Sequence, residues 1–346
     1  MSNPLIIRAD ADSRMGTGHV MRCLALGQAW QDAGGAVVFI TCCENETLLQ
    51  RLRDEKFTVI KMNNPDEFLT RLSSDLRPLS SGEWLVFDGY HFDLVCQRAV
   101  RAAGFKLLLI DDYNHLPEYE CDILLNQNIN APELHYCVNP EAKQLLGTQY
   151  ALLRREFRAG NRNDRTVPAE ARNILVTLGG ADPDNVTLKV VQALNYLNIC
   201  GLHVRIIVGP ANPHIESLRD AAGLSTFDIR LLSDVKDMPQ LMRWADLAVS
   251  AAGSTCWELC SLGVPILTVI LAENQAGLAV RLEKSGASKN MGWHYQSDVV
   301  GFAGAIRNLL EQEMLRTRLA CQAGHLVDGC GCNRVIKAIN GDREIK

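Results

Sequence analysis

The sequence predicts an α/β protein made of two doubly wound, Rossmann-like domains that face a cleft. Three observations lead to this prediction. Short runs that are apolar throughout alternate with longer segments of helical periodicity, a polar stretch at 158–172 breaks the alternation, and a second series of the same kind follows. Strands that are apolar on both sides form parallel sheets covered by helices on both faces, and such alternation builds doubly wound domains.

The first series predicts six strands with helices between them. LIIRAD, WLVFDG and KLLLID are typical of these strands, because each is a short apolar run bounded by polar residues or glycine. The strands are expected at 5–10, 37–42, 57–62, 84–89, 106–111 and 122–127, and the helices near 19–33, 45–55, 66–76 and 92–103.

The stretch RAGNRNDRTVPAEAR, at 158–172, is polar, charged and without an apolar period, which is typical of a linker. It separates an N-terminal domain at 1–157 from a C-terminal domain at 173–346, whose last helix can pack back on the N-terminal domain. In the second domain the strands are expected at 173–180, 203–209, 227–233, 247–252 and 265–271, and the helices near 184–198, 213–222, 236–243, 255–262, 274–284 and after 297.

Length, composition and charge exclude several classes of protein. The 346 residues suit about two domains, and 47% hydrophobic residues with 22% charged residues suit a globular core. A net charge of −5 argues against nonspecific nucleic-acid binding, and no apolar run reaches the roughly 18 residues of a membrane span. The N-terminus does not look like a secretory signal. We expect a cytosolic protein without nucleic-acid or membrane partners, either a monomer or a weak homo-oligomer.

The twelve cysteines do not form the paired CxxC spacing of a zinc site. In a long chain without an export signal, most of them are expected to be small buried hydrophobic residues rather than disulfides. The histidines at 115, 135, 203, 214, 294 and 325 also lack the HxH and HExxH spacings of metal sites. No metal site is therefore expected.

The stretch RADADSRMGTGHVM carries the first glycine turn beyond a strand's carboxyl end, where doubly wound domains bind ligands. Gly16, Thr17 and Gly18 let a ligand approach the backbone, and the following helix start attracts anions. Met21 stands where a dinucleotide fingerprint has its third glycine, so no nicotinamide cofactor is expected. His19 lies at the positive helix end, which disfavours its protonated form and suits a neutral base. The residues alone leave a phosphate cradle, a general base and plain packing open.

The second glycine turn is LVTLGGADPDNVT, in the C-terminal domain. Gly179 and Gly180 follow a strand, and the Asp-Pro-Asp at 182–184 suits the start of a helix. Backbone N–H groups beside the glycines can hold a phosphate. An ordinary strand-to-helix turn is the alternative.

The third glycine turn lies in SAAGSTCWELC, where a strand ends in small residues. Gly253 leaves space for a phosphate at the next helix start, and Ser254 or Thr255 can cap that helix. Glu258, on its first turns, is placed to accept hydrogen bonds from ribose hydroxyls, although a lone carboxylate on a helix is usually only solvated. The next strand leads to polar groups at a ligand-binding position, namely Glu273, Asn274 and Gln275.

In the N-terminal domain, FDGYHFD places Asp88, Tyr90 and His91 just past a strand end. One or two of them are candidates to orient water or substrate, and helix-start or turn roles are the alternative. Asp111 and Asp112 follow the next strand, and for Asp112 a turn or capping role is the preferred interpretation.

Together, RADADSRMGTGHVMRCLALGQAW, LVTLGGADPDNVT and SAAGSTCWELCSLGVPILTVILAENQ resemble the UDP-2,4-diacetamido-2,4,6-trideoxy-β-L-altropyranose hydrolases of pseudaminic acid biosynthesis. The resemblance covers nearly the whole chain, including 110–128 and 150–157. The order and spacing of the three motifs make it specific. That family is similar to the two-domain GT-B glycosyltransferases, especially the peptidoglycan N-acetylglucosaminyltransferase, with water in place of the sugar acceptor.

The resemblance implies that the C-terminal domain holds UDP, that the sugar faces the N-terminal domain, and that His19 is the general base. Water would attack the anomeric carbon with inversion, without a metal or cofactor. The other implied residues are Glu258 at the ribose, Gly253 to Thr255 at the diphosphate, and Asn274 and Gln275 at the sugar or phosphate side. Tyr90 matches a tyrosine of the family that follows a strand end, and it is expected to be a second catalytic residue.

Two other function classes remain open from the sequence. A UDP-sugar-dependent GT-B glycosyltransferase would share the nucleotide half, and it would differ by transferring the sugar to an acceptor. A noncatalytic protein that binds UDP or a UDP-sugar would carry the same glycine turns and would not depend on His19.

Overall fold

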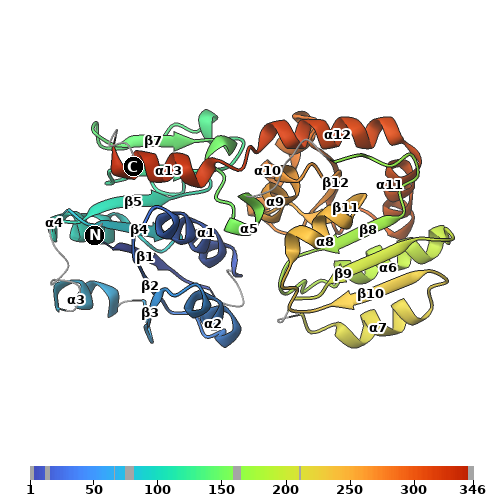
Figure 1. The fold of residues 1–346 in the computed structure, drawn as a ribbon, viewed down its shortest axis with the longest axis horizontal. Helices are drawn as coiled ribbons and strands as arrows, with labels where there is room; N and C mark the ends of the chain where they lie inside the picture. The colour runs from blue at the N-terminus through green and yellow to red at the C-terminus, as the bar shows by residue number, and fades with distance from the viewer. Residues whose placement is uncertain are drawn as a thin grey trace. The chain divides into compact units, whose positions relative to one another are not determined.

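The computed structural model describes residues 4–11, 16–65, 67–74, 82–158, 165–209 and 212–341, with the backbone alone at 71–74. Within these residues the protein is α/β with two parallel sheets, as the sequence predicts (Figure 1). The chain divides into two compact units. Unit 1 comprises 1–158 and 329–346, and unit 2 comprises 159–328.

Unit 1 contains a seven-stranded sheet in the order β3-β2-β1-β4-β5-β6-β7, in which all neighbouring strands are parallel. Its strands are β1 (Leu5–Ala9), β2 (Val37–Thr41), β3 (Thr58–Lys61), β4 (Trp84–Asp88), β5 (Lys106–Ile110), β6 (Ile123–Asn126) and β7 (Lys143–Leu146). Its helices are α1 (Gly18–Asp32), α2 (Glu46–Asp54), α3 (Glu67–Ser74), α4 (Leu94–Ala102), α5 (Arg155–Arg158) and α13 (Gly331–Asn340), with short 3₁₀ turns η1 (Ala131–Glu133) and η2 (Thr148–Tyr150).

Unit 2 contains a six-stranded parallel sheet in the order β10-β9-β8-β11-β12-β13. Its strands are β8 (Asn173–Thr177), β9 (His203–Ile207), β10 (Asp228–Leu232), β11 (Leu247–Ala251), β12 (Ile266–Ile270) and β13 (Ser288–Trp293). Its helices are α6 (Val186–Leu197), α7 (Ile215–Gly223), α8 (Met238–Trp244), α9 (Thr255–Ser261), α10 (Glu273–Lys284), α11 (Val299–Glu311) and α12 (Glu313–Leu326).

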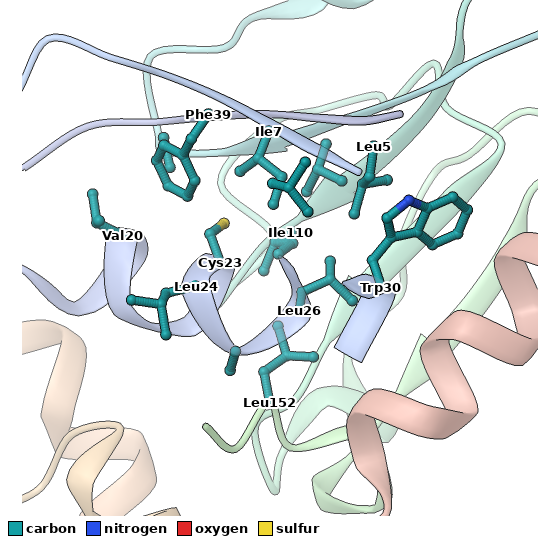
Figure 2. Close-up of a cluster of buried hydrophobic side chains, with 14 of the residues drawn as sticks. Leu5, Ile7, Val20, Cys23, Leu24, Leu26, Trp30, Phe39, Ile110 and Leu152 are labelled. Atoms are coloured by element: carbon teal, nitrogen blue, oxygen red, sulfur yellow. The ribbon is translucent and has the colours of Figure 1, made fainter. Parts of the chain in front are cut away.

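The core of unit 1 follows from the alternation of side chains along its strands. Leu5 and Ile7 of β1 face helix α1 on one side of the sheet, while Ile6 belongs to the core on the other side. Figure 2 shows Leu24 and Trp30 of α1 in the first of these layers, below the sheet. Helix α1 is buried along most of its length, which fixes the position of its first turn relative to β1.

Each sheet has one point at which the strand order reverses, between β1 and β4 in unit 1 and between β8 and β11 in unit 2. Crevices for ligands form beyond the carboxyl ends of the two strands that flank such a point. The segment after β1 contains His19, and Asp88 ends β4. The segments after β8 and β11 contain the second and third glycine turns.

The C-terminal helix lies with the N-terminal domain, which is the packing that the sequence allows for the last helix of 173–346. Helix α13 belongs to unit 1 and packs against α1, because Val335, Ile336 and Ile339 complete the unit 1 core. The first residue of α13 also lies close to the backbone that follows η2, since a Cβ at Gly331 would lie 2.2 Å from the carbonyl oxygen of Ala151.

The predicted linker at 158–172 lies partly outside the described residues, at 159–164. Its remainder is tied to unit 2, because Arg165 donates hydrogen bonds to the carbonyls of Arg243 and Ala245. Strands β7 and β13 were not predicted. Both lie at sheet edges, and KQLL and SKNMGW lack the continuous apolar run of the central strands. Among the described helices, none has the length and apolarity needed to cross a membrane.

Candidate functional site

His19 and Asp88 meet at the reversal point of the unit 1 sheet. His19 is the second residue of α1, directly after the turn that follows β1, and Asp88 is the last residue of β4. Nδ1 of His19 lies 2.6 Å from Oδ1 of Asp88, and both side chains are buried. An ionised carboxylate only accepts hydrogen bonds, so in the neutral imidazole Nδ1 carries the proton and Nε2 has the lone pair. No described residue hydrogen-bonds Nε2.

Arg22 holds Asp88 in its ionised form. Its Nε and Nη2 donate to Oδ2 and Oδ1 of Asp88, each at 2.6 Å. Burial acts to raise the pKa of Asp88, but the charge of Arg22 and the hydrogen bonds from Arg22 and His19 outweigh it and hold that pKa well below its usual range. Asp88 is therefore a fixed negative charge behind the imidazole at neutral pH.

The same guanidinium carries a second carboxylate, Asp112. Nη1 and Nη2 of Arg22 donate to Oδ1 and Oδ2 of Asp112 at 2.7 and 3.0 Å. Asn128 donates to Oδ1 of Asp112 at 2.9 Å. Asp112 thus takes part in the site, contrary to the turn or capping role preferred from the sequence.

Tyr90 contacts both Asp112 and His19. Its hydroxyl donates to Oδ2 of Asp112 at 2.8 Å, and its ring meets that of His19 edge to face with centroids 5.1 Å apart. Burial and the nearby charge of Asp112 raise the pKa of Tyr90 well above its usual value, so the phenol stays protonated. We call the five residues the base network: His19, Asp88, Arg22, Asp112 and Tyr90.

His91 and Asp111 lie outside the base network. Nε2 of His91 is 3.3 Å from Oδ2 of Asp10, a carboxylate that also bonds Arg8. Asp111 accepts from the Tyr136 hydroxyl at 2.7 Å and from backbone amides of the following turn. Asp111 therefore has the turn role that was the alternative for it.

The first glycine turn is open to solvent. Gly16 and Thr17 are exposed, while Gly18 begins α1. Gly16 has a φ of +72°, which favours glycine, and a Cβ there would meet no atom within 4 Å. Residues 12–15, which precede this turn, lie outside the described residues.

The glycines of unit 2 leave open space at the reversal point of the second sheet. A Cβ added to Gly179, Gly180 or Gly253 would meet no atom within 4 Å. Gly179 also has a φ of +92°. By contrast, a Cβ at Gly209 would lie 2.2 Å from the carbonyl oxygen of Gly180, so the loops after β8 and β9 touch through their backbones. Gly209 is thus required by packing, whereas packing does not account for Gly180 and Gly253.

The two helix starts of this region differ from each other. Asp182 is buried and accepts from the amides of Val186 and Thr187 at 2.8 and 2.9 Å, so it caps α6. Ser254 stands at the capping position of α9, but its side chain makes no capping hydrogen bond within the described part of the chain. The capping role expected for it is therefore not observed, and its hydroxyl is exposed.

The other sequence-predicted residues of unit 2 lie on the helices that follow β11 and β12. Thr255 begins α9, and Glu258 lies three residues further on, half-buried. Asn274 is exposed on the first turn of α10, and Gln275 accepts from the amide of Leu271 at 2.9 Å. Gln275 therefore stabilises the start of α10.

In the parts of the chain that the structure describes, no three His, Cys, Asp or Glu side chains are grouped so as to hold a metal ion. The twelve cysteines are free thiols.

Sequence reasoning missed Arg22 and Asn128 and underrated Asp112. The signal for Arg22 was available, since it follows His19 by three residues and so shares its helix face. The partners of Arg22 could not be predicted from the sequence, because Asp88 and Asp112 lie 66 and 90 residues away in the chain.

The comparisons with known proteins agree with this architecture. Residues 173–316 match the family model described as the Glycosyltransferase family 28 C-terminal domain. The crystal structure of Acinetobacter baumannii MurG aligns with a TM-score of 0.68 at 17% identity, covering 98% of this chain and 99% of that one. The predicted GT-B fold is thereby confirmed.

Two relatives align along most of the chain. The spore coat polysaccharide biosynthesis protein SpsG of Bacillus subtilis is 26% identical over 332 residues, which is 95% of each chain. The UDP-2,4-diacetamido-2,4,6-trideoxy-beta-L-altropyranose hydrolase of Campylobacter jejuni is 26% identical over 285 residues, 82% of this chain and 97% of that protein. The resemblance to these hydrolases, expected from the three motifs, is confirmed.

Proposed function

We propose that this chain hydrolyses a UDP-linked 2,4-diacetamido-2,4,6-trideoxy hexose of the β-L-altropyranose type to the free sugar and UDP, a step in pseudaminic acid biosynthesis. The observation that carries the proposal is the His19–Asp88 pair at 2.6 Å, which leaves one imidazole nitrogen available at a ligand-binding edge. The name of the Campylobacter jejuni relative supplies the substrate.

In the proposed reaction a water oxygen attacks the anomeric carbon as the bond from that carbon to the diphosphate oxygen breaks. The bonding electron pair leaves with UDP, and the water proton moves to Nε2 of His19. Asp88 stabilises the imidazolium that forms, as the carboxylate of a catalytic triad does. Attack from the face opposite UDP inverts the anomeric configuration. General base catalysis of this kind contributes about 10²- to 10⁴-fold to the rate.

Tyr90 has a separate role in the proposal. Because its phenol remains protonated and donates to Asp112, it does not compete with His19 as a base. Its ring packs against the imidazole and thereby fixes the direction of Nε2. Gly16, Thr17 and Gly18 give the sugar room next to the base.

Unit 2 is assigned the nucleotide. The open backbone at Gly179, Gly180 and Gly253 is the kind of surface on which amide groups hold phosphates. Such donors also stabilise the charge that develops on departing UDP, so the proposal needs no metal or cofactor. The other residues assigned to the substrate are Ser254 and Thr255 at the diphosphate, Glu258 at the ribose, and Asn274 and Gln275 at the sugar or phosphate side.

One observation favours a second candidate, a UDP-sugar-dependent glycosyltransferase. The family model that matches 173–316 describes the C-terminal domain of a glycosyltransferase family. In that case the base would activate an acceptor hydroxyl instead of water.

The two candidates differ in their need for an acceptor. The purified protein is incubated with the UDP-diacetamido-trideoxy-altrose and EDTA, without an acceptor, beside a His19→Asn variant. Hydrolysis predicts equal amounts of free sugar and UDP from the wild type and almost none from the variant. Turnover only after addition of an acceptor would instead identify a transferase. UDP binding without any turnover would identify a noncatalytic protein.

A further inference from the structure

We propose that the exposed ring of Tyr113 is the surface on which the apolar side of the substrate's sugar lies, which makes Tyr113 a specificity-determining residue. The inference rests on the proposed function and goes beyond it, since it names what recognises the sugar. It begins from an exposed aromatic residue: Tyr113 is 48% exposed on the loop after β5, beside the base network.

The rings around Tyr113 connect it to the base. Its centroid lies 5.1 Å from that of Tyr90, which in turn lies 5.1 Å from that of His19. His115 contacts both tyrosine rings, at 5.7 Å from Tyr113 and 5.4 Å from Tyr90. Tyr113 is thus one ring removed from the imidazole, with part of its surface open to solvent.

The backbone under Tyr113 is held in place. The buried carboxylate of Asp111 accepts from the amides of Tyr113 and Asn114 at 2.9 and 2.6 Å. Asn114 adopts a left-handed conformation with a φ of +59°, and its side chain donates to the carbonyl of His135 at 3.1 Å. A ligand that used this ring would therefore meet a pre-positioned surface, which lowers the entropy cost of binding.

Packing alone does not explain Tyr113. Tyr119 and Tyr136, in the same aromatic cluster, are buried, and their hydroxyls donate to Asp111. Tyr113 is exposed, and no described residue hydrogen-bonds its hydroxyl. Tyr119 and Tyr136 therefore form the buried part of the cluster, whereas Tyr113 is exposed.

The chemistry of the ring fits the proposed sugar. The face of an aromatic ring is negative, and it attracts the weakly positive C–H groups of a pyranose. A 2,4-diacetamido-2,4,6-trideoxy sugar carries a methyl group at C6 and two acetamido methyl groups, so it offers more apolar surface than an ordinary hexose. Such a surface gains from contact with an aromatic side chain.

The test uses Tyr113→Ala, Tyr113→Phe and a matched control, Tyr196→Ala, which removes another exposed tyrosine from helix α6 of unit 2. KM and kcat are measured with the UDP-sugar, and dissociation constants are measured by calorimetry for UDP and for the UDP-sugar. We expect Tyr113→Ala to raise KM about three- to tenfold. Tyr113→Phe and Tyr196→Ala should remain close to wild type, and the dissociation constant for UDP should not change in any variant.

Three results would overturn the inference. They are an unchanged KM in Tyr113→Ala, a rise in KM in Tyr113→Phe as large as that in Tyr113→Ala, or a loss of UDP affinity in Tyr113→Ala as large as its loss of UDP-sugar affinity. Failure of the proposed function would give a different result, since the wild type would then bind UDP without hydrolysing the UDP-sugar. In that case the dissociation constants decide. A fall in UDP-sugar affinity relative to UDP in Tyr113→Ala alone supports the sugar surface, and an unchanged ratio rejects it.

Discussion

Nδ1 of His19 and Oδ1 of Asp88 lie 2.6 Å apart, between the first turn of α1 and the last residue of β4. Two segments separated by almost 70 residues thus meet at the point where the strand order of unit 1 reverses. The carboxylate selects the tautomer of the imidazole, and Arg22 neutralises the carboxylate. The position of the His19 imidazole, the proposed base, therefore depends on a buried ion pair as well as on the glycine turn before it.

The first prediction concerns Asp88→Asn. The amide keeps the shape of the side chain but can donate to Nδ1, which would place the proton on Nε2 and remove the base. We expect kcat to fall at least about 10²-fold, as for the equivalent change in a catalytic triad. Steady-state kinetics at neutral pH measure the effect. An unchanged kcat with intact folding would contradict the role assigned to Asp88.

The second prediction concerns stability. Arg22→Ala leaves the fully buried carboxylate of Asp88 without its main counter-charge. We expect a loss of about 3–5 kcal/mol in the unfolding free energy of unit 1. Urea unfolding measures this loss, with hydrogen exchange of peptides from α1 as the probe of unit 1.

The control for Arg22 is Arg98→Ala, in which a 58% exposed guanidinium loses its ion pairs to Glu118 and Glu120. Exposed pairs of this kind contribute about 0–1 kcal/mol. Equal effects of the two substitutions would show that the Arg22 pair does not stabilise unit 1.

The third prediction is a dependence of stability on pH. The pKa of Asp88 is lowered in the folded protein, so its contribution is complete above the unfolded pKa of about 4 and is lost as the pH falls toward the folded value. The difference in unfolding free energy between wild type and Asp88→Asn should be constant from pH 7 to about 5 and should shrink below about pH 4. Urea midpoints across this range test it, and a difference that is independent of pH would refute it.

The fourth prediction separates ligand binding from packing at the glycine turns of unit 2. A Cβ at Gly253 meets nothing within 4 Å, so Gly253→Ala should change the unfolding free energy by no more than about 0.5 kcal/mol. If the diphosphate approaches this backbone, the methyl group will weaken UDP binding about tenfold, which calorimetry can measure. Gly209→Ala is the contrasting variant, because its Cβ would collide with the backbone of Gly180 and destabilise the protein. Unchanged UDP affinity in Gly253→Ala would remove the diphosphate from this turn.

The fold was largely predictable because its central strands are apolar on both sides. LIIRA, WLVFD and NILVT each contain three or four consecutive apolar residues, and each forms a central strand. The edge strands β7 and β13 escaped prediction because exposed edges tolerate polar residues such as Lys143 and Asn290. The sequence allows the last helix to pack on the N-terminal domain, but the contacts of α13 with α1, some 300 residues earlier, are not encoded in a local pattern.

The candidate site was only partly predictable. His19 and the glycine turns carry local signals, since glycines at the start of a helix mark places where a ligand can approach. Arg22 shares a helix face with His19, but its pairing with Asp112 joins segments 90 residues apart and carries no local signal. Tyr113 was not singled out in the sequence, and only the structure shows that its ring lies 5.1 Å from that of Tyr90.

The central claim is that water activated by His19 attacks the anomeric carbon. The most direct test is turnover of UDP-2,4-diacetamido-2,4,6-trideoxy-β-L-altrose in ¹⁸O-water, with the products followed by mass spectrometry and the first anomer formed followed by NMR. The account predicts ¹⁸O at C1 of the free sugar, unlabelled UDP, an inverted first anomer, and a rate about 10²- to 10⁴-fold lower in His19→Asn. Label in the released UDP would mean attack at phosphorus, and it would contradict the role assigned to His19.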